Sequence, residues 1–283
     1  MLLTPRYDTT PIIAVDVRVP GAHPVVQQRR RLEALLGDLR DDEWLQPSRC
    51  DEWTVQDVIT HLVSTNHFWA LSIAQARAGE PTRFLASFDP VASPAELVDS
   101  TQGTPPAATF EAFRTSTEDM VRVVEALDDD GWATLGEAPP GHVPLTLVAD
   151  HALWDSWVHE RDIVLPLGRV PVEDDGEVLT CLRYAAALGQ ALAIGRGGGG
   201  SGGSAVLEVT GPDARIVVSA QGDQVRVHDG PAPGGARVGR LSAVPLLEML
   251  SRRDAGQPEP EVVGWLAAGL ATVFDEAEVA EPA

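Results

Sequence analysis

The chain has 283 residues, 44% of them hydrophobic, and a formal net charge of −21 at pH 7. The length suffices for two ordinary domains, and the hydrophobic fraction supplies a core for each. An acidic surface of this size repels nucleic acid and anionic membranes, so we expect neither as a partner. The one basic cluster, Arg29 to Arg31, is expected on the solvated first turn of a helix.

Cysteine usage and hydropathy point to a soluble, cytoplasmic protein. Two cysteines, Cys50 and Cys181, give neither a disulfide framework nor a cysteine-based zinc spacing. The first 25 residues lack a long apolar run after a basic start, and no stretch reaches the ~18 apolar residues needed to span a bilayer. High Ala, Gly, Arg and Asp usage with almost no Lys is typical of a GC-rich, actinobacterial-type genome.

Five helices are expected in the first two thirds of the chain. Residues 1–23 contain three prolines and no clear period, which predicts a loose N-terminal arm. An amphipathic helix begins at Pro24, and a second begins after Thr54, which can form a capping box with Asp57. This second helix is expected to end near residues 79–81. Further helices are expected over 110–127, from Pro144 to about 166, and over 175–194.

The composition changes abruptly at residues 197–204, which read GGGGSGGS and predict a flexible linker. Alternating runs after it predict strands over 205–210, 215–219, 224–228 and 238–241, followed by helices over 243–253 and 261–274. The expected architecture is therefore an all-α domain over 24–196 and a smaller α+β domain over 205–283.

The fourth helix carries the strongest chemical signal. His151, Asp155 and His159 recur at intervals of four residues, so one otherwise apolar helix face carries all three. Burying a carboxylate with two imidazoles is costly unless they pair or bind a cation, and ligands one helical turn apart are a standard way to hold zinc. His61, mid-helix among apolar residues, is the natural third ligand.

The same residues also have a structural interpretation. A single histidine on a helix face is more often a satisfied core residue than a ligand, and Asp155 and His159 could form a simple hydrogen-bonded pair. Of the other histidines, His67 and His142 are expected at the surface or in loops, and His228 on a strand with a structural role.

Two segments resemble a known family. PSRCDEWTVQDVITHL, residues 47–62, looks like the first motif of the mycothiol-dependent maleylpyruvate isomerase family, and LWDSWVHERDIVLPLG, residues 153–168, resembles its second. That family belongs to the wider DinB-like metal-binding four-helix bundles. The C-terminal segment resembles the family's small sterol-carrier-protein-like domain. The resemblance implies an up-down four-helix bundle followed by a small α+β domain.

Carried over position by position, the resemblance implies that His61, Asp155 and His159 bind the metal. Asp155 stands where the family usually has Glu; its side chain is one methylene shorter, which leaves room for His151 as a substitute or fourth ligand. Asp162 matches the acidic position after the histidine, where it would support the site or the thiol cofactor. Arg161 is a second candidate for cofactor binding, with an ion pair at the helix end as the alternative.

The implied chemistry is zinc-dependent activation of a low-molecular-weight thiol, mycothiol in the family, which attacks a small electrophile. An adduct that reverts after bond rotation gives isomerisation, and a persistent one gives S-conjugation. With no cysteine near His61 or His159 in the sequence, we expect the nucleophile to come from outside, and no catalytic side chain is assigned. The reaction is expected in a dry cleft between the two domains.

Two alternatives stay open on sequence grounds. One is a non-catalytic protein that holds a metal or small ligand in the same bundle. The other is a metal-dependent hydrolase or lyase in which metal-bound water is the nucleophile. The sequence identifies no substrate, and it fits either a monomer or a homodimer.

Overall fold

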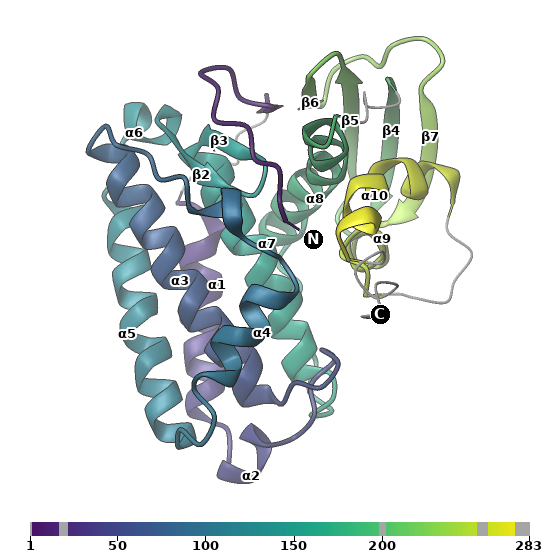
Figure 1. Ribbon diagram of the computed structural model, residues 1–283. Coiled ribbons are helices and arrows are strands. Elements are labelled where there is room, and N and C mark those ends of the chain that lie inside the picture. The colour runs from purple at the N-terminus through teal and green to yellow at the C-terminus, as the bar shows by residue number, and fades with distance from the viewer. Residues whose placement is uncertain (1, 17–21, 198–201, 254–259, 275–283) are drawn as a thin grey trace, which may run out of the picture.

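The computed structural model describes residues 2–16, 22–197, 202–253 and 260–274 (Figure 1). Four helices form an antiparallel bundle on one side: α1 (Pro24–Gly37), α3 (Val55–Arg77), α5 (Pro106–Glu125) and α7 (Leu145–Val164). A five-stranded sheet with three helices lies on the other side. The structure therefore has the expected DinB-like helical domain and an α+β domain.

Helix α3 shows how local sequence positions a candidate ligand. The Thr54 side chain accepts a hydrogen bond from the Asp57 backbone N–H, and the Asp57 carboxylate accepts one from the Thr54 backbone, so the predicted capping box is confirmed. The helix then buries the predicted face, including Val58, Leu62 and Trp69. His61 lies on this face and is directed into the bundle.

Shorter elements join the bundle helices. They are α2 (Asp41–Trp44), the 3-10 turn η1 (Phe84–Ser87), α4 (Ala92–Asp99), α6 (Asp129–Ala133) and the hairpin of β2 (Leu135–Ala138) with β3 (Gly141–Pro144). The expectation for His142 was wrong: it is buried on β3, where Nε2 lies 2.9 Å from the Thr82 carbonyl oxygen. His67 is exposed, as predicted.

The α+β domain contains the four predicted strands, β4 (Gly203–Thr210), β5 (Ala214–Gln221), β6 (Gln224–His228) and β7 (Arg237–Ser242). β4, β5 and β6 are antiparallel, whereas β7 runs parallel to β4. Helices α8 (Asp175–Gly195), α9 (Ala243–Leu250) and α10 (Glu261–Phe274) pack against this sheet. Residues 198–201 of the expected linker, 197–204, lie outside the described residues, whereas Gly203 and Ser204 differ from the prediction because they pair with β5 as the start of β4.

The N-terminal arm differs from the prediction of a loose segment. Strand β1 (Ile13–Val15) pairs in parallel with β6 and completes the sheet in the order β1-β6-β5-β4-β7. Leu3, Ile12 and Ile13 are buried. Prolines hid this strand because they interrupt the alternation of side chains that predicts strands, and the partner strand is more than 200 residues away in sequence.

Helix α8 lies between the bundle and the sheet (Figure 1) and packs against α7, α9 and α10. It is long and apolar enough to cross a membrane by length and composition, but 78% of that window is buried inside the protein, as in the core helix of a globular domain. Gly189 of α8 and Gly269 of α10 face each other so closely that a Cβ at either would overlap the facing backbone. Glycine is therefore required for this helix crossing.

The basic triplet on α1 also differs from the prediction of a solvated face. Arg30 is exposed and pairs with Glu125 at the surface. Arg29 is fully buried, and Arg31 donates hydrogen bonds to Glu160 and Glu177. Helix periodicity explains the difference, because consecutive residues are about 100° apart and cannot all share one face.

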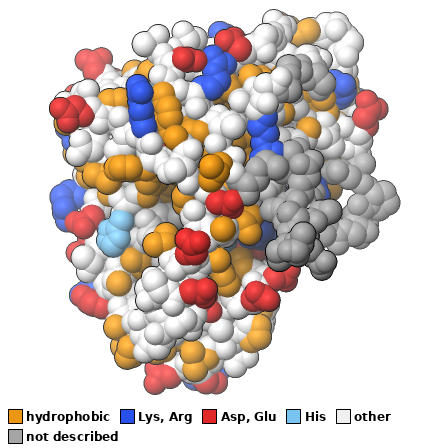
Figure 2. Space-filling view, viewed as in Figure 1, with side chains coloured by type: hydrophobic (Ala, Val, Ile, Leu, Met, Phe, Trp, Pro, Cys, Tyr) orange, Lys and Arg blue, Asp and Glu red, His pale blue; other side chains and the backbone are white. Residues whose placement is uncertain are grey.

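Acidic side chains are distributed over the face shown in Figure 2, in keeping with the net charge of −21.

Candidate metal centre

The structure brings three of the predicted ligands together between α3 and α7. One donor atom each from His61, Asp155 and His159 lies within 4.8 Å of the others. Nε2 of His61 and Nε2 of His159 each lie 3.6 Å from Oδ1 of Asp155. All three residues are largely buried, and the imidazole rings of the two histidines meet edge to face at 4.9 Å.

These distances fit a bound cation better than a hydrogen-bonded cluster. At 3.6 Å, the nitrogen–oxygen separations exceed those of ordinary hydrogen bonds. Ligand atoms about 2.0–2.2 Å from a tetrahedral zinc ion are roughly 3.3–3.6 Å from one another. Two imidazoles and one carboxylate are also a donor set that zinc accepts, and three protein ligands leave a coordination position open.

Unpartnered polar atoms point to the same conclusion. Oδ2 of Asp155 and Nδ1 of His61 are buried and have no hydrogen-bond partner in the described part of the chain. An unpaired buried polar group costs free energy, so such groups call for a ligand or ion. The residues therefore fit a divalent metal.

The charge state of the cluster follows from burial and its neighbours. Burial raises the pKa of the Asp155 carboxyl, but contacts with His61 and His159 outweigh this effect and hold the pKa well below its usual range. Burial lowers the pKa of His159, but the neighbouring Asp162, Cys50 and Asp155 raise it to about 10. Without metal, His159 is thus protonated at neutral pH, and a metal must displace that proton.

Asp162 contacts His159 on the side of the imidazole ring that faces away from Asp155. Its Oδ2 lies 3.0 Å from Nδ1 of His159, the ring nitrogen opposite the one that faces Asp155. Burial raises the pKa of Asp162, but the contacts with His159 and Arg253 lower it by more, so the pKa lies below its usual value and the carboxylate is charged. A metal-binding histidine commonly donates its second N–H to a carboxylate, which fixes the orientation of the ring. Asp162 has this geometry and does not face the open side of the cluster.

The inference that no cysteine lies near His159 was wrong. Sγ of Cys50 lies 3.7 Å from Nδ1 of His159 and donates a hydrogen bond to Oδ2 of Asp162 at 3.3 Å. The sequence separates Cys50 from His159 by more than 100 residues, so only the fold reveals the contact. The thiol therefore lies near Nδ1 of His159, whereas Nε2 of the same ring faces Asp155.

A tight turn between residues 47 and 54 presents Cys50. Its ends pair at Pro47 and Thr54, the Trp53 N–H donates to the Cys50 carbonyl, and Ser48 Oγ accepts from the Cys50 N–H. The Arg49 N–H donates to the Asp162 carbonyl, which ties the turn to α7. The first sequence motif therefore supplies both the cap of α3 and the support of the second motif.

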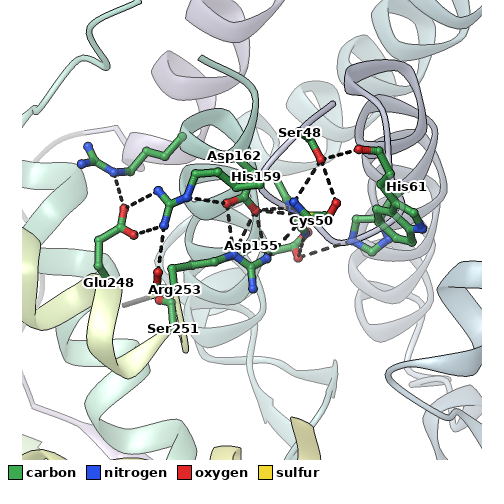
Figure 3. Close-up of polar contacts among 12 residues, drawn as sticks. Ser48, Cys50, His61, Asp155, His159, Asp162, Glu248, Ser251 and Arg253 are labelled. Atoms are coloured by element: carbon green, nitrogen blue, oxygen red, sulfur yellow. Dashed lines mark hydrogen bonds and ion pairs between the residues drawn. The ribbon is translucent and has the colours of Figure 1, made fainter. Parts of the chain in front are cut away.

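The α+β domain also reaches this centre, in keeping with the expected site between the domains, although the sequence did not identify the residues that do so (Figure 3). Arg253, just after α9, donates to both carboxylate oxygens of Asp162 at 2.9–3.1 Å and lies 3.7 Å from Sγ of Cys50. Glu248 of α9 accepts hydrogen bonds from Arg49 and Arg161. The centre is thus built where the two domains meet.

Two further predicted residues lie elsewhere. Arg161 pairs with Glu248 and Glu173 and lies over the Trp157 ring, so it joins the domains and is not directed into the metal cluster. His151, proposed as an additional ligand, is not in the three-residue cluster. Its Nδ1 lies 2.6 Å from the Tyr184 hydroxyl on α8, so its ring is held one turn away.

Comparison with known proteins bears on the family and the fold. Residues 25–164 match the family model described as mycothiol maleylpyruvate isomerase N-terminal domain. Two solved structures, a mycothiol-dependent maleylpyruvate isomerase and a histidine-to-alanine mutant of it, share the fold, each with a TM-score of 0.58 and 18% identity. Each alignment covers 83% of this chain and 93% of the other. None of the curated proteins matches the sequence.

Proposed function

Because the helical domain of this chain belongs to the mycothiol maleylpyruvate isomerase N-terminal domain family, we propose that the protein is a metal- and thiol-dependent isomerase or transferase. The metal is zinc, the thiol is a low-molecular-weight one such as mycothiol, and the substrate is a small electrophile. The observation that carries the proposal is the buried cluster of His61, Asp155 and His159, whose three donors are one fewer than a tetrahedral zinc ion takes.

In this proposal His61 and His159 each hold the metal through Nε2, and Asp155 holds it through a carboxylate oxygen. When bound, the metal supplies a site for a thiolate sulfur and lowers the pKa of the thiol, so that a nucleophile exists at neutral pH. The chain orients the site: Asp162 holds His159 by its Nδ1, and Arg253 neutralises Asp162. Helices α3 and α7 exclude water from the buried side of the cluster.

An external thiol suits this site better than Cys50 does. The Cys50 thiol donates to Asp162 and lies on the far side of the His159 ring from Asp155. Addition of an external thiol to an electrophilic carbon forms a C–S bond; reversal after bond rotation gives isomerisation, and persistence gives an S-conjugate. We place the reaction in the cytoplasm, where low-molecular-weight thiols stay reduced.

Maleylpyruvate is the first substrate to test, because the similar solved structures are of enzymes named for it. The test begins with metal analysis of the purified protein, followed by reaction of the zinc-loaded enzyme with maleylpyruvate or a panel of small electrophiles, with and without mycothiol. We expect one equivalent of zinc and product formation only when the thiol is present.

His159→Ala is the diagnostic variant and His67→Ala its control, because His67 is an exposed histidine on α3. We expect His159→Ala to lose bound metal and turnover, and His67→Ala to keep both. Full activity of metal-free His159→Ala would refute the proposal. Turnover without thiol would replace it with a hydrolase or lyase, and stable metal binding without any turnover would indicate a binding protein.

A further inference from the structure

His151 has a defined place beside the metal cluster that ligand binding does not explain. It lies on the same face of α7 as Asp155, one turn earlier, and is buried. Its ring packs against those of Trp69, Trp154 and Tyr184, with centroids 4.8, 5.4 and 5.3 Å away. The ion pairs of Asp155 in the described structure go to His61 and His159, not to His151.

Tyr184 determines where the ring proton of His151 lies. The phenol is buried, and its oxygen lies 2.6 Å from Nδ1 of His151, the hydrogen-bond partner the structure gives it. Burial raises the pKa of Tyr184 well above its usual value, so the phenol keeps its proton. If Nδ1 carried a proton, the buried phenol O–H would have no acceptor among the described residues, at a cost of about 1–3 kcal/mol. Nδ1 therefore accepts, and the proton lies on Nε2.

The ring is also neutral. Burial lowers the pKa of His151 to about 4, and the opposing effect of Asp155 does not restore it. A neutral imidazole with its proton on Nε2 donates a hydrogen bond from that atom. Among the described residues, Nδ1 of His151 has a hydrogen-bond partner and Nε2 has none; Nε2 is also not one of the fully buried unpartnered atoms, so it keeps some contact with solvent.

A second donor beside it also lacks an acceptor. Trp69 is 3% exposed, its ring packs against that of His151, and its Nε1 is buried without a partner in the described structure. Buried N–H groups in proteins are nearly always paired, so the unpaired Nε1–H of Trp69, next to the His151 ring with its unpartnered Nε2–H, points to a ligand that brings an acceptor oxygen. His151 lies one helical turn before Asp155 on α7, and Trp69 packs against the His151 ring from α3.

We propose that His151 donates a hydrogen bond from Nε2 to a carbonyl or carboxylate oxygen of the electrophilic substrate, assisted by Trp69. The inference rests on the proposed function. It applies to electrophiles whose reactive carbon–carbon double bond is conjugated to such an oxygen.

The chemistry balances without proton transfer from His151. When the thiolate sulfur adds to the carbon–carbon double bond, a C–S bond forms and the π-electron pair moves onto the conjugated oxygen. The hydrogen bond from His151 stabilises this oxyanion. After rotation about the resulting single bond, the electron pair returns, the C–S bond breaks and the thiolate leaves. Removing one such donor costs about 10²–10³-fold in turnover in well-studied enzymes.

The first test uses ¹⁵N-histidine-labelled, zinc-loaded protein and NMR at neutral pH. We expect the Nε2–H tautomer at His151, and we expect its ¹⁵Nε2 signal to move when pyruvate is added as a carbonyl and carboxylate probe, while the signal of His228 on β6 stays in place. Tyr184→Phe should produce a mixture of tautomers. An Nδ1–H tautomer in the wild type, or a signal that pyruvate leaves unchanged, overturns the proposal.

The second test compares His151→Phe and His151→Gln in the thiol-dependent assay. Phe fills the space without a donor, whereas the Gln amide can donate. We expect His151→Phe to lose about 100-fold in kcat and His151→Gln to recover about tenfold, with zinc content equal to the wild type in both. Loss of zinc in His151→Phe would make His151 a ligand, and an unchanged kcat would remove its role; either result overturns the proposal. If the wild type shows no thiol-dependent turnover, the proposed function fails, and the NMR test still decides on His151.

Discussion

Asp162→Asn tests how far one buried carboxylate supports both domains and the metal centre. Asp162 is fully buried and accepts hydrogen bonds from Cys50 and from Arg253, and it pairs with His159. The amide has nearly the same shape but no charge, so two cationic groups lose their buried partner. Removing one member of a buried ion pair costs about 3–5 kcal/mol of unfolding free energy.

The same substitution should weaken metal binding. The asparagine no longer supplies a charged acceptor at Nδ1 of His159, and loss of such an outer partner costs about 10–100-fold in metal affinity. Urea unfolding of the metal-free protein measures the stability change, and competition with a chromophoric chelator measures zinc affinity. Asp119→Asn is the control, because Asp119 pairs with Arg122 at the surface of α5 and should change stability by less than about 1 kcal/mol.

The pH dependence gives a further check. The pKa of Asp162 is below its usual value, so its contribution is present above the unfolded pKa of about 3.9 and is lost as the pH falls through the folded pKa. The stability difference between wild type and Asp162→Asn should be full at pH 6 and narrow below pH 4. A variant within 1 kcal/mol of the wild type at pH 6, with unchanged zinc affinity, would refute the reasoning.

Three shorter predictions follow from the same structure. Zinc binding should release a proton from His159, whose pKa without metal is about 10, so the apparent zinc affinity should rise about tenfold per pH unit from pH 7 to 9. Calorimetry in buffers of different ionisation enthalpy measures the proton release, and an absence of release would contradict the assigned charge state. Arg31→Leu should lower the free energy of unfolding by about 3–5 kcal/mol, because the buried Glu160 and Glu177 lose their partner. The control Arg30→Leu, at an exposed position, should cost less than about 1 kcal/mol. Equal urea unfolding midpoints for the two variants would contradict this expectation. Gly189→Ala should lower the thermal midpoint by forcing α8 and α10 apart, and an unchanged midpoint would show that the crossing can adjust.

The second domain has a role in the site as well as in the fold. Arg253 and Glu248 connect it to Asp162, Arg49 and Arg161 through charged hydrogen bonds. The Trp154 indole on α7 also donates to Ser251 at 2.9 Å. Substitution of Arg253 should therefore alter zinc affinity through Asp162 without touching a ligand.

The sequence by itself determined the periodic and local features. The capping box of Thr54 and Asp57 set the start of α3, and the four-residue spacing of Asp155 and His159 put both on one face of α7. The strands of the α+β domain followed from alternation and glycine turns. The position of His61, mid-helix among apolar residues, made it the expected partner of this pair, and the two motifs implied the same through resemblance.

Only the tertiary structure decided the features that depend on contacts between residues far apart in the sequence. Cys50 and Arg253 meet Asp162 from a turn and a domain that are each about 100 residues away, and no local pattern encodes such a meeting. The arm strand β1 required β6 as its partner, and His151 turned toward Tyr184 and not toward the metal cluster. Periodicity fixes which face a side chain occupies, but which atom it finds there depends on the packing of other elements.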